Sequence, residues 1–219
     1  MIEKLVHQTW KNACPEHWIF RKSRTAVSRF FPGWEYKLWT DEDLDHLVRT
    51  RFPEYYAGWD SLDRGIKKVD VARYFILYLH GGIYADLDFI FTQDPAHLFE
   101  DGNDLYFYQS TQALVKGWDF LGNAFMGSTA GHPFWLQLVD YMLALPATTP
   151  VLHHTGPLAI GAFYKTLVEK PGTTIFGPDL FDNQSCQDGI GKRVYGYHMR
   201  MASWHGPGRR DGLVKNTNL

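Results

Sequence analysis

The sequence predicts an α/β fold in which helices flank a mixed, mostly parallel sheet, built as one domain over residues 1–219. Two short apolar segments near the start, Ile2 to Gln8 and Trp34 to Trp39, have the composition of buried strands. Residues 61–91 carry apolar side chains at helical spacing, followed by a Gly-Gly pair and a strongly apolar run. Alternating strands and helices are typical of parallel sheets with helical connections.

A helix is predicted to begin at Thr40, because Thr40 and Asp43 have the spacing of a capping box. We expect it to run to about Val48 and to be interrupted at Phe52-Pro53, since proline cannot continue a helix.

Acids alternate at Asp41, Asp43 and Asp45 with the spacing of an EF-hand loop. Such a loop needs glycine at its sixth position and glutamate at its twelfth, where this chain has His46 and Phe52. Acids also favour the first turn of a helix, where they interact with its dipole. We therefore interpret them as a helix start and exclude calcium there.

The most informative stretch surrounds Gly81-Gly82. Gly81 is placed as a helix C-cap and Ile83-Tyr84-Ala85 as the strand that follows. Asp86 and Asp88 then lie inside an apolar run that continues with Phe89-Ile90-Phe91. Charged groups among apolar ones are costly without a partner, so the pattern indicates a ligand site. The apolar residues that define the helix are Ile66, Val69, Ala72, Phe75, Ile76 and Leu79.

The rest of the chain alternates in the same way. Residues from Gly206 onward, 206–219, are Gly-rich and polar and are expected to form a flexible tail or lid. The other predicted elements are strands over Leu105 to Gln109, Asn123 to Gly127 and Arg193 to His198, and helices over Pro133 to Leu145 and Pro157 to Val168.

Composition excludes some classes of partner. The net charge of −2 gives no broad field for a nucleic-acid polymer, so a phosphate-bearing ligand needs a local site. Aromatic residues make up 16% of the chain, and their rings suit sugars or bases as well as a core. With no apolar run long enough to span a bilayer, we expect a cytoplasmic protein or, alternatively, a truncated Golgi enzyme. Cys14 and Cys186 are equally compatible with a disulfide and with free thiols.

Two carboxylates at the end of an apolar strand are well placed to hold a divalent cation, because ligands gather at the carboxyl ends of strands in such sheets. Asp86 and Asp88 are therefore candidate ligands for Mn²⁺ or Mg²⁺. Asp70 and Arg73 lie three residues apart on the preceding helix, where both side chains project from one face. They either converge on the same ligand or form a surface ion pair.

Four segments together resemble the family 32 glycosyltransferases, which contain a DXD motif. The block from Asp70 to Asp88 is more specific than the DXD tripeptide alone, and the matches follow the family order over most of the chain. The segments are IEKLVHQTW (2–10), FPGWEYKLWTD (31–41), DVARYFILYLHGGIYADLD (70–88) and HMRMASW (198–204).

The resemblance implies a GT-A fold, a nucleotide-sugar donor, a glycan or glycoconjugate acceptor, Mn²⁺ or Mg²⁺, and transfer with retention of anomeric configuration. It implies catalytic roles for Asp70, Arg73, Asp86 and Asp88, and a metal site formed by Asp86, Asp88 and His198. The implied donor-binding residues are His7, Gln8, Trp10, Asp70, Arg73, Tyr84, Asp86, Ser203 and Trp204, and the implied acceptor cavity contains Asn123, Thr155, Gly156 and Pro157.

No carboxylate nucleophile stands out, which favours front-face displacement by the acceptor hydroxyl. The resemblance implies GDP-mannose or a UDP-hexose as the donor, and the residues leave both open. Two rivals remain. A haloacid-dehalogenase-like phosphohydrolase also begins with an apolar strand and Asp-x-Asp, although its motif belongs near the N-terminus. A sugar-nucleotide-binding module without catalysis would keep the same donor motifs.

Overall fold

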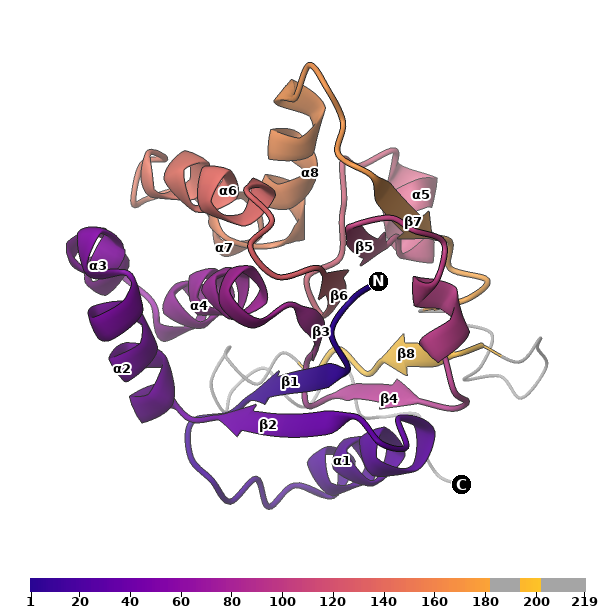
Figure 1. Cartoon of the computed structure of the whole chain (residues 1–219). Coiled ribbons are helices and arrows are strands. Elements are labelled where there is room, and N and C mark those ends of the chain that lie inside the picture. The colour runs from indigo at the N-terminus through magenta and orange to yellow at the C-terminus, as the bar shows by residue number, and fades with distance from the viewer. Residues whose placement is uncertain (182–193, 202–219) are drawn as a thin grey trace.

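The computed structural model describes residues 1–181 and 194–201. Within them, six strands form one sheet in the order β2-β1-β3-β6-β5-β7, and β4 pairs with β8 in a second, two-stranded sheet (Figure 1). The strands are β1 (Leu5–Thr9), β2 (Glu35–Trp39), β3 (Gly82–Ala85), β4 (Phe89–Phe91), β5 (Leu105–Tyr108), β6 (Phe125–Ser128), β7 (Thr173–Phe176) and β8 (Gly196–His198).

The large sheet is mixed and mostly parallel, as the sequence predicts. β1 is parallel to β2 and β3, and β5 is parallel to β7, whereas β6 is antiparallel to both β3 and β5. Because β6 alone is reversed in this sheet, its amino end meets the carboxyl ends of β1 and β3. Residues that precede β6 therefore share an edge with residues that follow β3.

Helices cover both faces of the sheet (Figure 1). The helices α2, α3, α4, α6 and α8 share a core with one face, and α1, β4 and the 3₁₀ helix η1 share an aromatic core with the other. The helices are α1 (Trp18–Phe30), α2 (Asp41–Arg51), α3 (Pro53–Asp60), α4 (Gly65–His80), η1 (Ala96–Phe99), α5 (Thr111–Lys116), α6 (Phe134–Leu143), α7 (Val151–His154) and α8 (Pro157–Thr166).

The predicted start of α2 is confirmed. The Thr40 side chain accepts from the Asp43 N–H, and the Asp43 side chain accepts from the Thr40 N–H, which completes a capping box. Pro53 does interrupt the helix, but it also opens α3, because proline is well tolerated at the first helical position.

The sequence did not reveal α1. His17 caps this helix by accepting from the Ile19 N–H, and the first turn has no acidic residue, so the usual serine, threonine or aspartate signal is missing. The strand predicted over Ile83-Tyr84-Ala85 is confirmed as β3. It ends at Ala85, and Asp86 to Asp88 form a turn into β4, so the two carboxylates follow the strand, as predicted.

The last predicted strand, Arg193 to His198, is present as β8, although Arg193 lies outside the described residues. Residues 206–219 also lie outside them, so the flexible tail or lid stays a prediction. None of the helices in residues 1–181 and 194–201 is long and apolar enough to cross a membrane.

Gly82 offers a test of the packing between β3 and β1. Its φ is +78°, and a Cβ atom there would lie 2.4 Å from the Leu5 carbonyl oxygen. Gly33 has nearly the same φ, +79°, but nothing lies within 4 Å of an added Cβ. Gly82→Ala is therefore expected to lower the free energy of unfolding by about 3 kcal/mol or more, and Gly33→Ala by about 1 kcal/mol. Urea denaturation measures both, and equal losses would contradict the close packing of β3 on β1.

Candidate active site

The Asp86-Leu87-Asp88 turn lies at the carboxyl end of β3. The Asp86 N–H donates to the Ala124 carbonyl at 2.8 Å, which ties the turn to the residues before β6. The Phe89 N–H donates back to the Asp86 carbonyl at 2.9 Å and closes the turn. β4 then begins at Phe89, so the two carboxylates are held between two buried strands.

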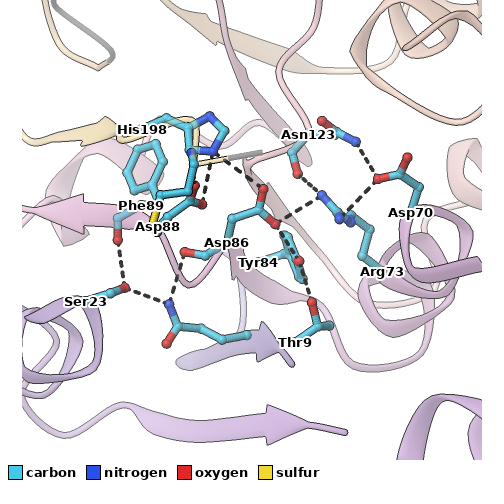
Figure 2. Close-up of polar contacts among 12 residues, drawn as sticks. Thr9, Ser23, Asp70, Arg73, Tyr84, Asp86, Asp88, Phe89, Asn123 and His198 are labelled. Carbon is cyan, nitrogen blue, oxygen red and sulfur yellow. Dashed lines mark hydrogen bonds and ion pairs between the residues drawn. The ribbon is translucent and has the colours of Figure 1, made fainter. Parts of the chain in front are cut away.

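His198 joins these carboxylates because β8 pairs with β4 and places His198 opposite Phe89. Its Nε2 atom lies 3.1 Å from Asp88 Oδ1 and 3.8 Å from Asp86 Oδ2. One ligand atom from each of Asp86, Asp88 and His198 lies within 4.8 Å of the other two. The predicted metal residues are therefore brought together, as Figure 2 shows.

Asp88 stays ionised in this environment. Burial opposes its charge, but His198 and the Met201 N–H, which donates to Oδ2 at 2.8 Å, outweigh burial and hold the pKa of Asp88 below its ordinary value. The side chain thus presents a carboxylate beside an imidazole.

Arg73 connects α4 to the turn. Its Nη2 atom lies 3.1 Å from Asp70 Oδ1, and its Nη1 atom lies 3.2 Å from Asp86 Oδ1 and donates to the Asn123 carbonyl at 2.8 Å. The side chains of Asp70 and Arg73 are only 5% and 4% exposed, so the alternative of a surface ion pair is wrong. One guanidinium bridges two carboxylates that lie 16 positions apart in the sequence.

Asp70 also binds residues from the second half of the chain. Its carboxylate accepts from Asn123 Nδ2 at 3.0 Å and from Thr155 Oγ1 at 2.8 Å. Burial raises the pKa of Asp70 to about 6, although Arg73 and these hydrogen bonds work in the other direction. Two residues of the predicted acceptor cavity thus meet a predicted donor residue.

The other two cavity residues lie beside Thr155. Gly156 caps α8 and Pro157 is its first residue, and the Pro157 carbonyl accepts from the Leu121 N–H at 3.1 Å. Neither residue has a polar side-chain atom, so each contributes only its shape and its backbone groups to the cavity.

Tyr84 fixes the orientation of the Asp86 side chain. Its hydroxyl donates to Asp86 Oδ1 at 2.7 Å and lies 2.9 Å from Thr9 Oγ1. The Arg73 guanidinium lies over the Tyr84 ring at 4.7 Å from its centroid. Thr9 was not predicted, and its only signal in the sequence was its place at the end of a strand between two predicted donor residues.

Gln8 supports the turn from inside the protein. Its Nε2 atom donates to the Asp86 carbonyl at 3.3 Å and to Ser23 Oγ at 3.0 Å, and Ser23 donates to the Phe89 carbonyl at 2.7 Å (Figure 2). The Tyr36 hydroxyl donates to Gln8 Oε1 at 3.0 Å. Ser23 was missed because it lies on α1, and only recognition of that helix would have placed it here.

His7 lies apart from this group. Trp39 Nε1 donates to His7 Nδ1 at 3.1 Å, and His7 Nε2 lies 3.0 Å from the Gly81 carbonyl oxygen. These contacts leave the ring neutral with its proton on Nε2. Burial lowers the pKa of His7 to about 3, despite the hydrogen bond to Gly81.

Trp10 packs on Phe20, with 4.3 Å between the ring centroids, and belongs to the apolar cluster that contains Leu87, the middle residue of the Asp86-Leu87-Asp88 turn. Ser203 and Trp204 lie outside the described residues, so their predicted roles stay predictions.

Comparison with known proteins identifies the family. Residues 8–106 match the family described as a glycosyltransferase sugar-binding region containing a DXD motif. The matched segment includes Gln8, the Asp70–Arg73 pair and the turn with Asp86 and Asp88. The chain belongs to this family. The resemblance seen in the sequence is thereby confirmed.

Curated relatives of this family member are fungal and viral proteins. The chain is 35% identical over 179 residues to inositol phosphoceramide mannosyltransferase 3 of Schizosaccharomyces pombe, covering 78% of this chain and 47% of that protein. It is 32% identical over 180 residues to a mannosyl phosphorylinositol ceramide synthase of Saccharomyces cerevisiae, covering 75% and 43%. An uncharacterized glycosyltransferase of Acanthamoeba polyphaga mimivirus is 28% identical over 137 residues, covering 61% and 52%. The chain thus spans about half the length of these relatives.

Solved structures support the fold. The PaToxG glycosyltransferase superposes with a TM-score of 0.58 at 14% identity, covering 76% of this chain and 70% of that one. Mouse xyloside xylosyltransferase 1 gives 0.51 at 13% identity, covering 90% and 98%. The expected GT-A fold is confirmed.

The buried His7 predicts a pH dependence of stability for this family member. Its folded pKa of about 3 lies below the ordinary value of 6.5, so its contribution is present above about pH 6.5 and is lost as pH falls toward 3. We expect a loss of about 2 kcal/mol between about pH 7 and about pH 5. In His7→Gln the unfolding free energy is lower but falls less over this interval. Urea denaturation at each pH measures it, with the exposed His46→Gln as control. The same decrease of the unfolding free energy over this pH interval in all three proteins would refute a neutral His7.

Proposed function

We propose that the chain is a metal-dependent hexosyltransferase that moves a hexose from a nucleotide-diphosphate sugar to a hydroxyl of a glycoconjugate. The observation that carries the proposal is the joining of the Asp86, Asp88 and His198 cluster to the buried Asp70–Arg73 pair at one sheet edge. Among donors, the names of the fungal relatives favour GDP-mannose over a UDP-hexose.

The side chains present fit a divalent metal ion. Asp86 and Asp88 offer oxygen ligands, and His198 offers a nitrogen ligand, which suits a transition-metal ion such as Mn²⁺ better than Mg²⁺. When bound, the metal ion would supply positive charge against the diphosphate that leaves the sugar.

The two oxygens of Asp86 have different environments. Oδ1 is occupied by Tyr84 at 2.7 Å and by Arg73 at 3.2 Å, whereas Oδ2 faces His198 at 3.8 Å. We assign Oδ1 to positioning and Oδ2 to ligand binding. Tyr84 and Arg73 thus fix the orientation of the Asp86 carboxylate and the direction in which Oδ2 points, so the oxygen assigned to ligand binding is pre-oriented.

Asp70 and Arg73 are proposed to hold the donor sugar. Asp70 is buried, and three groups donate to it, which makes it a poor nucleophile. This supports front-face displacement with retention. The acceptor oxygen bonds to the anomeric carbon on the side where the bond to the diphosphate breaks, and the acceptor proton passes to the departing phosphate oxygen.

The acceptor is proposed to be a glycan or glycolipid hydroxyl. Two of the fungal relatives are named for inositol phosphoceramide or mannosyl phosphorylinositol ceramide, so the inositol headgroup of a phosphosphingolipid is the first acceptor to try.

Donor binding is tested by a thermal-shift screen of GDP- and UDP-sugars with and without Mn²⁺. We expect GDP-mannose with Mn²⁺ to stabilise the protein by about 2.7 kcal/mol at a hundredfold excess over its dissociation constant. Asp88→Asn and His198→Ala should lose the Mn²⁺-dependent part, because each removes a ligand atom. Asp41→Asn changes an exposed acid on α2 and should behave as wild type.

The outcomes separate the rivals. Binding without transfer or donor hydrolysis would favour a non-catalytic sugar-nucleotide module. Phosphate release from simple phosphomonoesters, abolished in Asp86→Asn, would favour a phosphohydrolase. No shift with any nucleotide sugar would refute the donor site.

Front-face displacement predicts that no sugar becomes attached to the protein. Intact-mass measurement after incubation with donor and Mn²⁺, without acceptor, should show an unmodified chain. A hexose found on Asp70 or on another carboxylate would replace this mechanism with a double displacement.

Asp70→Asn is expected to lower kcat/KM about a hundredfold, since it removes a preorganised charge from the donor pocket. Thr155→Val is expected to have a smaller effect of the same sign.

A further inference from the structure

Helix α1 carries a concentration of positive charge that the proposed reaction does not use. Arg21, Lys22, Arg24 and Arg29 are all exposed, and the helix contains no acidic residue. The chain as a whole has a net charge of −2, so this face differs in sign from the average of the molecule. Trp18, at the first position of the helix, is 57% exposed.

These cations lack acidic partners within the described part of the chain. None of the four forms an ion pair with a carboxylate among residues 1–181 and 194–201. Other exposed cations do, since Arg49 pairs with Asp45. Unpaired cations on one face are available to an anionic partner.

The basic face continues into a hollow between α1 and β2. Arg21, Arg24 and Arg29 line this hollow of about 800 Å³ together with Trp34 and Tyr36. The Arg24 guanidinium lies over the Tyr36 ring at 5.8 Å from its centroid. Glu35 is the one acidic residue among the lining residues. Such a hollow suits a phosphorylated headgroup, because arginine binds phosphate oxygens well and aromatic rings favour the interface between water and lipid.

We propose that the outer face of α1 docks on a membrane surface that contains anionic phospholipids. A helix that combines basic residues with an exposed tryptophan is typical of segments that lie on such surfaces. Each basic residue near the surface adds to the attraction, and the attraction decreases as salt screens it.

The position of α1 relates the docking face to the active site. The inner face of the helix contacts β4, and Ser23 donates to the Phe89 carbonyl next to the Asp88 turn. Docking through the outer face therefore places the turn about one helix diameter, roughly 10 Å, from the headgroups. Only this last step, the reach to a lipid acceptor, rests on the proposed function, and binding to the membrane does not.

Vesicle co-sedimentation tests the docking without any donor or acceptor. Wild-type protein should bind phosphatidylcholine vesicles that contain phosphatidylserine, should bind pure phosphatidylcholine weakly, and should be released by high salt. The triple variant R21E/K22E/R29E should lose about a hundredfold in partition coefficient. The control R51E/K116E/K165E makes the same charge change on α2, α5 and α8 and should still bind. Circular dichroism and thermal unfolding are the measurements that check whether both variants fold.

The contrary results are equally clear. Equal binding to vesicles with and without phosphatidylserine, or equal losses in the two triple variants, would overturn the proposal. So would binding of the wild-type chain to single-stranded RNA without recruitment to vesicles. Donor binding in the thermal-shift screen should be the same in both variants, so a failure of docking is separable from a failure of the transferase proposal.

Discussion

A single buried guanidinium holds the proposed active site together. Arg73 lies between Asp70 and Asp86, and burial works against its charge, while Asp86, Tyr84 and Asp70 keep its pKa above the ordinary value. Two carboxylates against one guanidinium leave an excess of negative charge in a network where Asp70 is buried and Asp86 is partly buried, which is unfavourable unless hydrogen bonds compensate it. Asn123 donates to the Asp70 carboxylate and Tyr84 donates to the Asp86 carboxylate. The compensating donors thus come from elements that are distant in the sequence.

The reversed strand β6 makes that compensation geometrically feasible. Had β6 run parallel to β3, its carboxyl end would lie beside Asp86, and Asn123 would lie at the opposite edge of the sheet. Instead Ala85 pairs with Phe125, so the residues just before β6 meet the residues just after β3. The connection to α8 then adds Thr155. One topological feature thus joins the two halves of the chain at the site.

Local spacing in the sequence predicted the central residues of the site, whereas His198, Asn123 and Thr155, which reach it through packing, were predicted only from the family resemblance. The Asp70–Arg73 pair and the Asp86 turn are close in sequence, so helix and strand periodicity placed them correctly. Thr9 and Ser23 reach the site only through contacts between distant elements. His7 and Gln8 were both predicted beside the donor, yet neighbours in a strand point to opposite faces of the sheet. The structure places Gln8 toward the turn and His7 toward Trp39.

Helix α1 shows why a missed element has consequences for function as well as fold. Its inner face supports the Asp86-Leu87-Asp88 turn through Ser23, which also binds Gln8, so the position of the turn depends on the position of the helix. Its outer face bears the unpaired cations. The Ser23 hydroxyl thus connects the helix directly to the carbonyl of Phe89, the residue after Asp88, without any intervening loop. If α1 rests on a membrane, the Ser23 hydrogen bond places the Asp86-Leu87-Asp88 turn, which carries two of the proposed metal ligands, directly behind the docked helix and near the surface that carries a lipid acceptor.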